Sequence, residues 1–143
     1  MGIDMGPDSG LRLSKPERRQ KSKARLERVR VKGVHEVRMY VFARERYRCR
    51  CCRLRTANSM HEIQFRSRGG KVSRKNSIAV CGDGVNACHG FLQRHEITVF
   101  IGFDGAEGDL KFTPTTQQSA DWMRVKVGET VESPTMFQVE AAE

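Results

Sequence analysis

The 143-residue sequence predicts a small α+β domain with tails, and three observations support this fold class. Short strand-like segments are mixed with helix-prone ones along the chain. Hydrophobic residues make up 38% and aromatic residues 7% of the sequence, so a constraint beyond an apolar core is expected to hold the fold. Four of the five cysteines fall into two pairs, and a metal ion bound between them would supply that constraint.

The N-terminal part is expected to form a disordered end and then a basic helical arm. Residues 1–14 contain Gly, Asp, Ser and Pro, a composition typical of disorder. The run Ser-Lys-Pro-Glu at residues 14–17 has the Ser cap, the early Pro and the Glu of a helix start. Residues 15–46 are therefore predicted as helices that carry many Lys and Arg side chains.

A glycine is expected to divide this arm into two helices. The first helix would end before Gly33, and the second would run from about Val34 to Arg46. Val34, Val37 and Val41 recur at helical spacing in the second segment. We expect this apolar stripe to pack against the rest of the domain.

The cysteines indicate a metal site rather than disulfides, because their number is odd and no secretion signal precedes them. Cys49 and Cys52 have the Cys-x2-Cys spacing that lets one turn present two thiolates to a tetrahedral ion. Cys81 and Cys88 form the second pair, and the six residues between them begin with turn-forming types that allow the chain to loop back. These four cysteines are predicted to bind a structural zinc ion, with Cys51 left out.

The segment between the two cysteine pairs is predicted to form a ββα hairpin. Residues 59–65 and 77–80 are expected to be short strands, and residues 88–94 a short helix. A glycine-containing, strongly basic loop, residues 66–76, joins the strands. One His lies on the first strand and another on the helix, an arrangement typical of a metal-binding hairpin.

The C-terminal part is expected to add a β-hairpin and a helix. Residues 97–103 and 109–112 are predicted as the two strands. Thr113 and Pro114 are expected to start a helix that ends near Val125, and the residues after Gly128 are only weakly determined. The predicted parts, in order, are residues 1–14, 15–46, 47–96, 97–127 and 128–143.

The charge of +9 is unevenly distributed and indicates a polyanionic partner. Residues 11–50 hold 15 basic and 4 acidic side chains, and residues 51–80 hold 7 basic and 1 acidic. Residues 81–143 hold 4 basic and 10 acidic side chains. Because dense positive charge gathers phosphates through counterion release, a phosphate-bearing polyanion is the expected partner. No apolar run is long enough to span a membrane, so no membrane partner is expected.

Several short motifs together resemble the HNH endonuclease family in its zinc-bearing bacterial and phage form. They are His-Glu-Ile from His61, Arg-Ser-Arg-Gly-Gly-Lys from Arg66, Asn-Ser-Ile-Ala-Val-Cys from Asn76 and Cys-His-Gly from Cys88, flanked by the four cysteines. The similar stretch runs from about residue 47 to residue 95. The resemblance implies a ββα-metal core in residues 47–96 and a DNA endonuclease that hydrolyses phosphodiester bonds. It implies a base-activated water and one divalent cation, Mg²⁺ or another.

The resemblance also implies roles for individual residues. His61, Glu62 and His89 would form the catalytic set, and Asn76 would fix the loop by hydrogen bonds to the backbone. His89 matches the first helix position that binds the catalytic ion. The family often has a second His four residues later, where this sequence has Gln93, whose side-chain carbonyl could serve a hard cation.

The general base is left open between two neighbouring residues. Alignment with the family places His61 at the metal-ligand position and Glu62 at the base position. Adjacent strand residues point to opposite faces, so both can face one ion only if the strand is distorted. A neutral imidazole suits proton abstraction near pH 7 better than an ordinary carboxylate, which favours His61 as the base.

The basic loop is expected to bind the DNA backbone through five side chains: Arg66, Arg68, Lys71, Arg74 and Lys75. The expected location is the cytoplasm of a bacterial or phage-infected host cell. The main alternative is a catalytically inactive, zinc-stabilised module that binds nucleic acid, suggested by the altered His-Glu pair and the missing helix His. A zinc-stabilised protein-interaction domain is the third possibility.

Overall fold

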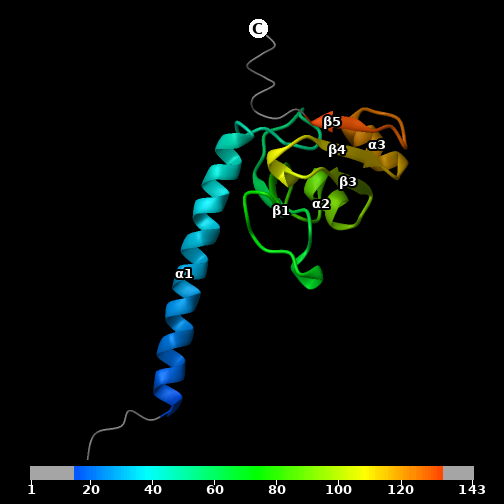
Figure 1. Cartoon of the computed structure of the whole chain (residues 1–143). Coiled ribbons are helices and arrows are strands. Elements are labelled where there is room, and N and C mark those ends of the chain that lie inside the picture. The colour runs from blue at the N-terminus through cyan, green and yellow to red at the C-terminus, as the bar shows by residue number, and fades with distance from the viewer. Residues whose placement is uncertain (1–14, 134–143) are drawn as a thin grey trace, which may run out of the picture. The chain divides into compact units, whose positions relative to one another are not determined.

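The computed structural model describes residues 15–133 (Figure 1). Among residues 15–31 it describes the side chains of Lys23, Arg25 and Arg28 alone. The segment predicted to be disordered, residues 1–14, lies outside the described residues, as does the end of the predicted tail from residue 134. The chain divides into two compact units, residues 1–33 and residues 34–143.

The predicted α+β class is confirmed, because the described part contains three α-helices and two small antiparallel sheets. The expected pair of basic helices is wrong: one helix, α1, runs over Lys15–Arg44 without a break at Gly33. A glycine inside a helix costs only about 1 kcal/mol relative to alanine, which its helix-forming neighbours outweigh. No helix in residues 15–133 is long and apolar enough to cross a membrane.

Two of the three residues of the predicted apolar stripe, Val37 and Val41, pack the last turns of α1 against the domain. Val41 and Phe42 are buried together with Ala57 and Ala79, and Val37 is partly buried against them. This small cluster fixes the end of α1 against the first sheet. The chain then turns into the segment that carries the first cysteine pair.

The first sheet consists of β1 (Ser59–Glu62) and β2 (Ser77–Val80), paired antiparallel. Every residue of β2 is buried, which makes it the central support of this half of the domain. Strand β1 is shorter than predicted, because the chain leaves the ladder after Glu62 and turns into a 3-10 helix, η1, over Arg66–Arg68. Helix α2 (Ala87–Gln93) follows β2 across the second cysteine pair.

The second sheet has the order β3-β4-β5, with β3 over Ile97–Ile101, β4 over Leu110–Pro114 and β5 over Val131–Ser133. The hairpin of β3 and β4 was predicted; β5 was not, since three residues carry too short a pattern. The predicted start of the last helix is wrong. Residues 113–114 end β4, and α3 (Gln117–Met123) begins after Thr116, whose hydroxyl accepts a hydrogen bond from the Ser119 N–H at 3.1 Å.

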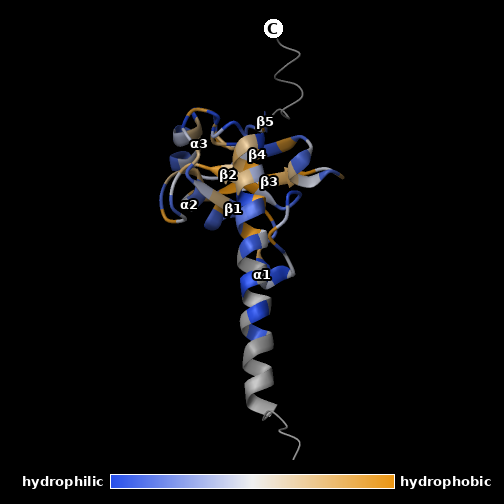
Figure 2. Cartoon of the chain, turned by 90° about the vertical axis from the view of Figure 1, so that its left-hand side faces the viewer, coloured by the Kyte–Doolittle hydropathy of each residue, from blue (hydrophilic) through white to orange (hydrophobic). Residues whose placement is uncertain are grey.

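The main core lies where the cysteines, α2 and the second sheet meet. Its fully buried aliphatic and aromatic members include Ile78, Val80, Leu110 and Phe112. Figure 2 shows hydrophobic residues gathered on the strands, whereas the coloured part of α1 is mainly hydrophilic. Since α2 contacts both β3 and α3, the residues on α2 are held from two sides.

Candidate functional site

The four predicted metal-binding cysteines come together in one buried cluster. The sulfurs of Cys49, Cys52, Cys81 and Cys88 all lie within 4.8 Å of one another, and the Sγ atoms of Cys52 and Cys81 are 4.0 Å apart. A tetrahedral zinc ion with Zn–S bonds of about 2.3 Å places its sulfurs about 3.8 Å apart. The donor set, its spacing and its enclosure therefore fit a structural zinc ion. Cys51 is buried in the same core outside this set.

The close contacts among the four thiols shift the pKa values of neighbouring cysteines in opposite directions. A hydrogen bond from Cys49 is the main cause that lowers the pKa of Cys52, and the same bond raises the pKa of Cys49. Four thiolates this close repel one another unless a cation lies between them. A divalent ion therefore suits the cluster in its fully deprotonated form.

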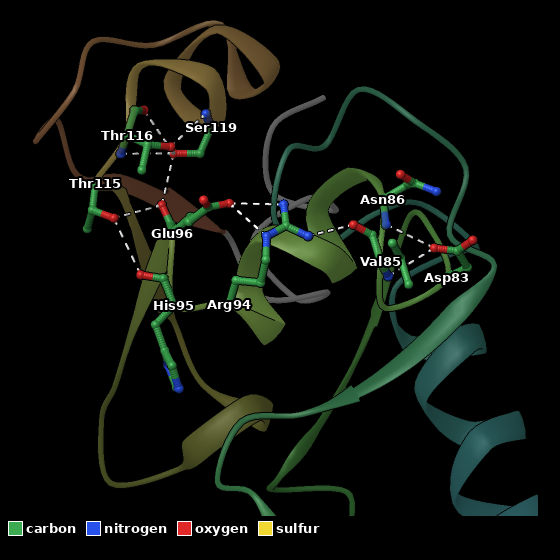
Figure 3. A network of polar contacts seen from close by, with 9 residues as sticks. All are labelled: Asp83, Val85, Asn86, Arg94, His95, Glu96, Thr115, Thr116 and Ser119. Carbon is green, nitrogen blue, oxygen red and sulfur yellow. Dashed lines mark hydrogen bonds and ion pairs between the residues drawn. The ribbon is translucent and has the colours of Figure 1, made fainter.

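The loop between Cys81 and Cys88 is closed by a carboxylate. One oxygen of Asp83 accepts backbone N–H bonds from Val85 at 3.0 Å and Asn86 at 2.9 Å (Figure 3). These two bonds lower the pKa of Asp83. The turn returns the chain so that the His89 N–H donates to the Cys81 carbonyl at 2.9 Å. Six intervening residues thus form a compact turn rather than a loose insertion.

A polar network holds the other end of α2. The Arg94 guanidinium donates to the Val85 carbonyl at 2.6 Å and to the Glu96 carboxylate at 2.9 Å. The Glu96 carbonyl accepts from the hydroxyls of Thr115 at 3.1 Å and Ser119 at 2.8 Å. Figure 3 shows the Arg94 guanidinium between the Val85 carbonyl and the Glu96 carboxylate. Helix α2 is therefore fixed at both ends, and its position sets where Cys88 and His89 lie.

The two predicted catalytic histidines lie side by side. The ring centroids of His61 on β1 and His89 on α2 are 5.3 Å apart. They line an open pocket of about 260 Å³. The pocket also includes Glu62, Gln93 and Arg66, and two apolar residues that sequence reasoning missed, Met60 and Phe65.

Burial shapes the chemistry of both imidazoles. His61 is 3% exposed, and burial, with smaller contributions from the charges of His89 and His95, lowers its pKa to about 4. Burial also lowers the pKa of His89, against the opposing charge of Asp83. The Nδ1 atom of His89 is buried without a hydrogen-bond partner. Both rings are therefore neutral near pH 7 and carry a lone pair for a proton or a metal ion.

Glu62 lines the pocket although it is the last residue of β1 and is paired with Ser77. Both Glu62 and His61 line the pocket, although neighbours on a regular strand face opposite ways. The carboxylate of Glu62 accepts from Arg66 Nε at 3.0 Å and forms an ion pair with its Nη2 at 3.0 Å. The Arg66 guanidinium thus binds both Glu62 carboxylate oxygens. The Arg66 side chain is itself 57% exposed.

Asn76 binds the backbone of the basic loop. Its Oδ1 accepts from the Gln64 N–H at 2.8 Å, and its Nδ2 donates to the carbonyls of Gln64 at 3.0 Å and Lys71 at 2.9 Å. The loop folds so closely that a Cβ on Gly70 would overlap the Gln64 carbonyl. Asn76 therefore fixes the loop without entering the histidine pocket.

The five basic residues of the loop do not form one patch. Arg66 lines the histidine pocket, whereas Lys71 and Lys75 line a second cavity. The guanidinium of Arg74 lies over the Tyr40 ring, 4.0 Å from its centroid. Arg68 is exposed at the end of η1. The cations are thus spread along the loop.

One buried charge network was missed by the sequence analysis. Arg50 lies between two cysteines of the first turn, is 1% exposed and forms an ion pair with Glu45 at 2.7 Å. It also donates to the carbonyls of Ala106 at 3.2 Å and Gly108 at 2.7 Å, while Arg44 donates to the same Glu45 oxygen. In a chain with many cations, no sequence signal separates this buried arginine from the exposed ones.

Comparisons with protein-family models, with curated proteins and with solved structures find no match to this chain.

Proposed function

We propose that this chain is a metal-dependent DNA endonuclease of the HNH type, built on a ββα core and stabilised by a zinc ion on its four cysteines. The observation that carries the proposal is the meeting of His61 and His89 in one open pocket, 5.3 Å apart between ring centroids. They come from β1 and α2, which the basic loop and β2 separate along the chain. The resemblance in sequence motifs supports the same reading.

The pocket offers groups for two tasks of phosphodiester hydrolysis. His89, with the side-chain carbonyl of Gln93 or with His61, would hold a divalent ion such as Mg²⁺. That ion would supply positive charge to the scissile phosphate. Arg66, at the mouth of the pocket, adds a forked donor for phosphate oxygens.

His61 is the better candidate for the general base. Its imidazole would accept a proton from an attacking water, although burial makes it a weaker base than an exposed histidine. The Glu62 carboxylate is already bound by Arg66, which competes for the oxygens that a base would use. In the alternative assignment, Glu62 is the base and His61 joins His89 as a metal ligand.

The proposed partner is DNA, which the protein would bind mainly through the backbone phosphates. The cations of the basic loop and of α1 neutralise backbone charge and so give affinity with little sequence preference. Of the α1 side chains described before Gly33, Lys23, Arg25 and Arg28 are exposed. The proposed place of action is the cytoplasm of a bacterial or phage-infected cell.

Nicking of supercoiled plasmid tests the proposal. Purified protein is incubated with Mg²⁺ or Mn²⁺, and the same assay is run with His89→Ala and without divalent ion. We expect nicking by the wild type that depends on the ion and falls at least about 100-fold in His89→Ala, the scale of a lost catalytic group. Wild-type protein that binds DNA but produces no metal-dependent nicks would overturn the nuclease.

The second candidate is an inactive, zinc-stabilised DNA-binding module. The observations that favour it are the Glu62–Arg66 ion pair, which occupies a catalytic carboxylate, and Gln93 at the place of a histidine. Binding without nicking in the same assay would support this module.

A further inference from the structure

The second cavity beside the basic loop has the composition of a site for an unpaired nucleotide. It measures about 360 Å³, within the size range of about 300–1,000 Å³ that small-ligand sites occupy. Lys71 and Lys75 contribute cations from the loop. Ile101, at the end of β3, and Phe103, in the turn that follows, contribute apolar surface. Positive charge and an aromatic ring thus line one groove.

Phe103 is the most unusual member of this groove. Its side chain is 97% exposed, although a phenylalanine ordinarily gains stability from burial. The Nζ atom of Lys75 lies 5.8 Å from the ring centroid. An exposed ring next to a cation is the arrangement that stacks a base and pairs with the neighbouring phosphate.

Backbone contacts join the two segments that form the groove. The Ala106 N–H donates to the Lys75 carbonyl at 2.8 Å, and Ala106 in turn accepts from the buried Arg50. Gly105 has a φ of 56° and approaches the Lys75 backbone so closely that a Cβ would clash with it. The turn after β3 and the basic loop therefore form one unit.

The groove also lies next to the histidine pocket along the chain. Gln64 lines the groove, and its neighbours Phe65 and Arg66 line the pocket. Asn76 holds this shared segment through two hydrogen bonds to the Gln64 backbone. One nucleic-acid strand that follows the basic loop would thus meet both sites.

We propose that this groove binds an unpaired nucleotide of single-stranded DNA, with the base stacked on Phe103 and the flanking phosphates on Lys71 and Lys75. The choice of DNA rests on the proposed function, whereas the stacking and charge arguments stand on the groove alone. A duplex keeps its bases stacked inside, so the groove favours single-stranded over double-stranded DNA.

Binding of the full zinc-loaded chain to a fluorescent single-stranded oligonucleotide, without Mg²⁺, tests this site. Phe103→Ala is expected to weaken binding about tenfold, the scale of one lost stacked base. Lys71→Ala and Lys75→Ala should each lower the slope of log affinity against log salt by about 0.7, the value for one phosphate on a single strand. Duplex binding should change less in Phe103→Ala.

The matched control is Phe100→Ala, which removes a 54% exposed phenylalanine from β3 outside the groove and should leave binding unchanged. A 2-aminopurine in the oligonucleotide should lose fluorescence on binding wild type but not Phe103→Ala, because stacking quenches it. Equal affinity of Phe103→Ala and wild type, or an equal loss in Phe100→Ala, would overturn the groove.

The oligonucleotide assay tests the groove, and the plasmid assay tests the nuclease, so either proposal can fail without the other. Nicking with unchanged oligonucleotide affinity in Phe103→Ala removes the groove and leaves the nuclease. Phe103-dependent binding without nicking removes the nuclease and leaves the groove.

Discussion

Two neighbouring sites of this protein share helix α2 and differ in their access to solvent. Cys88 is 0% exposed and belongs to the closed cluster, whereas His89, the next residue, lines an open pocket. The cluster has four thiols and no open position among its described neighbours, while the pocket mixes imidazole, carboxylate, amide and guanidinium groups. Closed sites of the first kind hold folds together, and open ones admit water and substrate. The comparison predicts that damage to the cluster destroys the fold, and damage to the pocket destroys activity alone.

The largest expected effect is loss of the metal from the cluster. Cys88→Ser, or chelation of the wild type, should abolish cooperative unfolding, because a structural zinc site contributes on the order of 10 kcal/mol to folding. Circular dichroism during heating measures this. Cys51→Ser is the matched control: Cys51 is also buried, lies outside the set and should cost only about 1–3 kcal/mol. Equal losses in both variants would contradict a metal site on these four sulfurs.

A smaller effect is expected from the buried charge network next to the cluster. Glu45→Gln leaves Arg50 buried without its anionic partner and should lower the free energy of unfolding by about 3–5 kcal/mol. The exposed pair of Lys111 and Glu132 is the control, and Glu132→Gln should cost less than about 1 kcal/mol. Urea unfolding measures both. A cost for Glu45→Gln no larger than that for Glu132→Gln would show that Arg50 is not held as described.

Within the pocket, activity should distinguish the two candidate bases. Glu62→Gln should keep the free energy of unfolding within about 1 kcal/mol, because it only breaks a partly exposed pair with Arg66. If His61 is the base, His61→Asn reduces metal-dependent nicking by about 100-fold or more, and Glu62→Gln reduces it much less. The opposite order would make Glu62 the base and His61 a ligand.

The sequence predicted the parts of the site that depend on residue type and spacing. The two cysteine pairs were found from their spacing, and they do converge in the structure. Strand β2 was predicted at its observed bounds. A run of four apolar or small residues between turn signals is too short for a helix and is typical of a buried strand.

The missed features depend on tertiary contacts instead. The burial of Arg50 follows from carbonyls more than fifty residues away, which no local pattern reveals. Thr113 and Pro114 look like a helix start, yet they end β4, and the cap is Thr116, two residues on. Glu62 lines the same pocket as its neighbour His61, which the alternation of a regular strand does not predict.

The separation of the two sites is tested most directly by measuring zinc content and plasmid nicking on the same samples of wild type and His89→Ala. The account predicts one zinc ion per chain and the same melting temperature in both proteins, with metal-dependent nicking in the wild type alone. Loss of zinc from His89→Ala would contradict it, because His89 would then belong to the cluster and not to a separate reactive pocket.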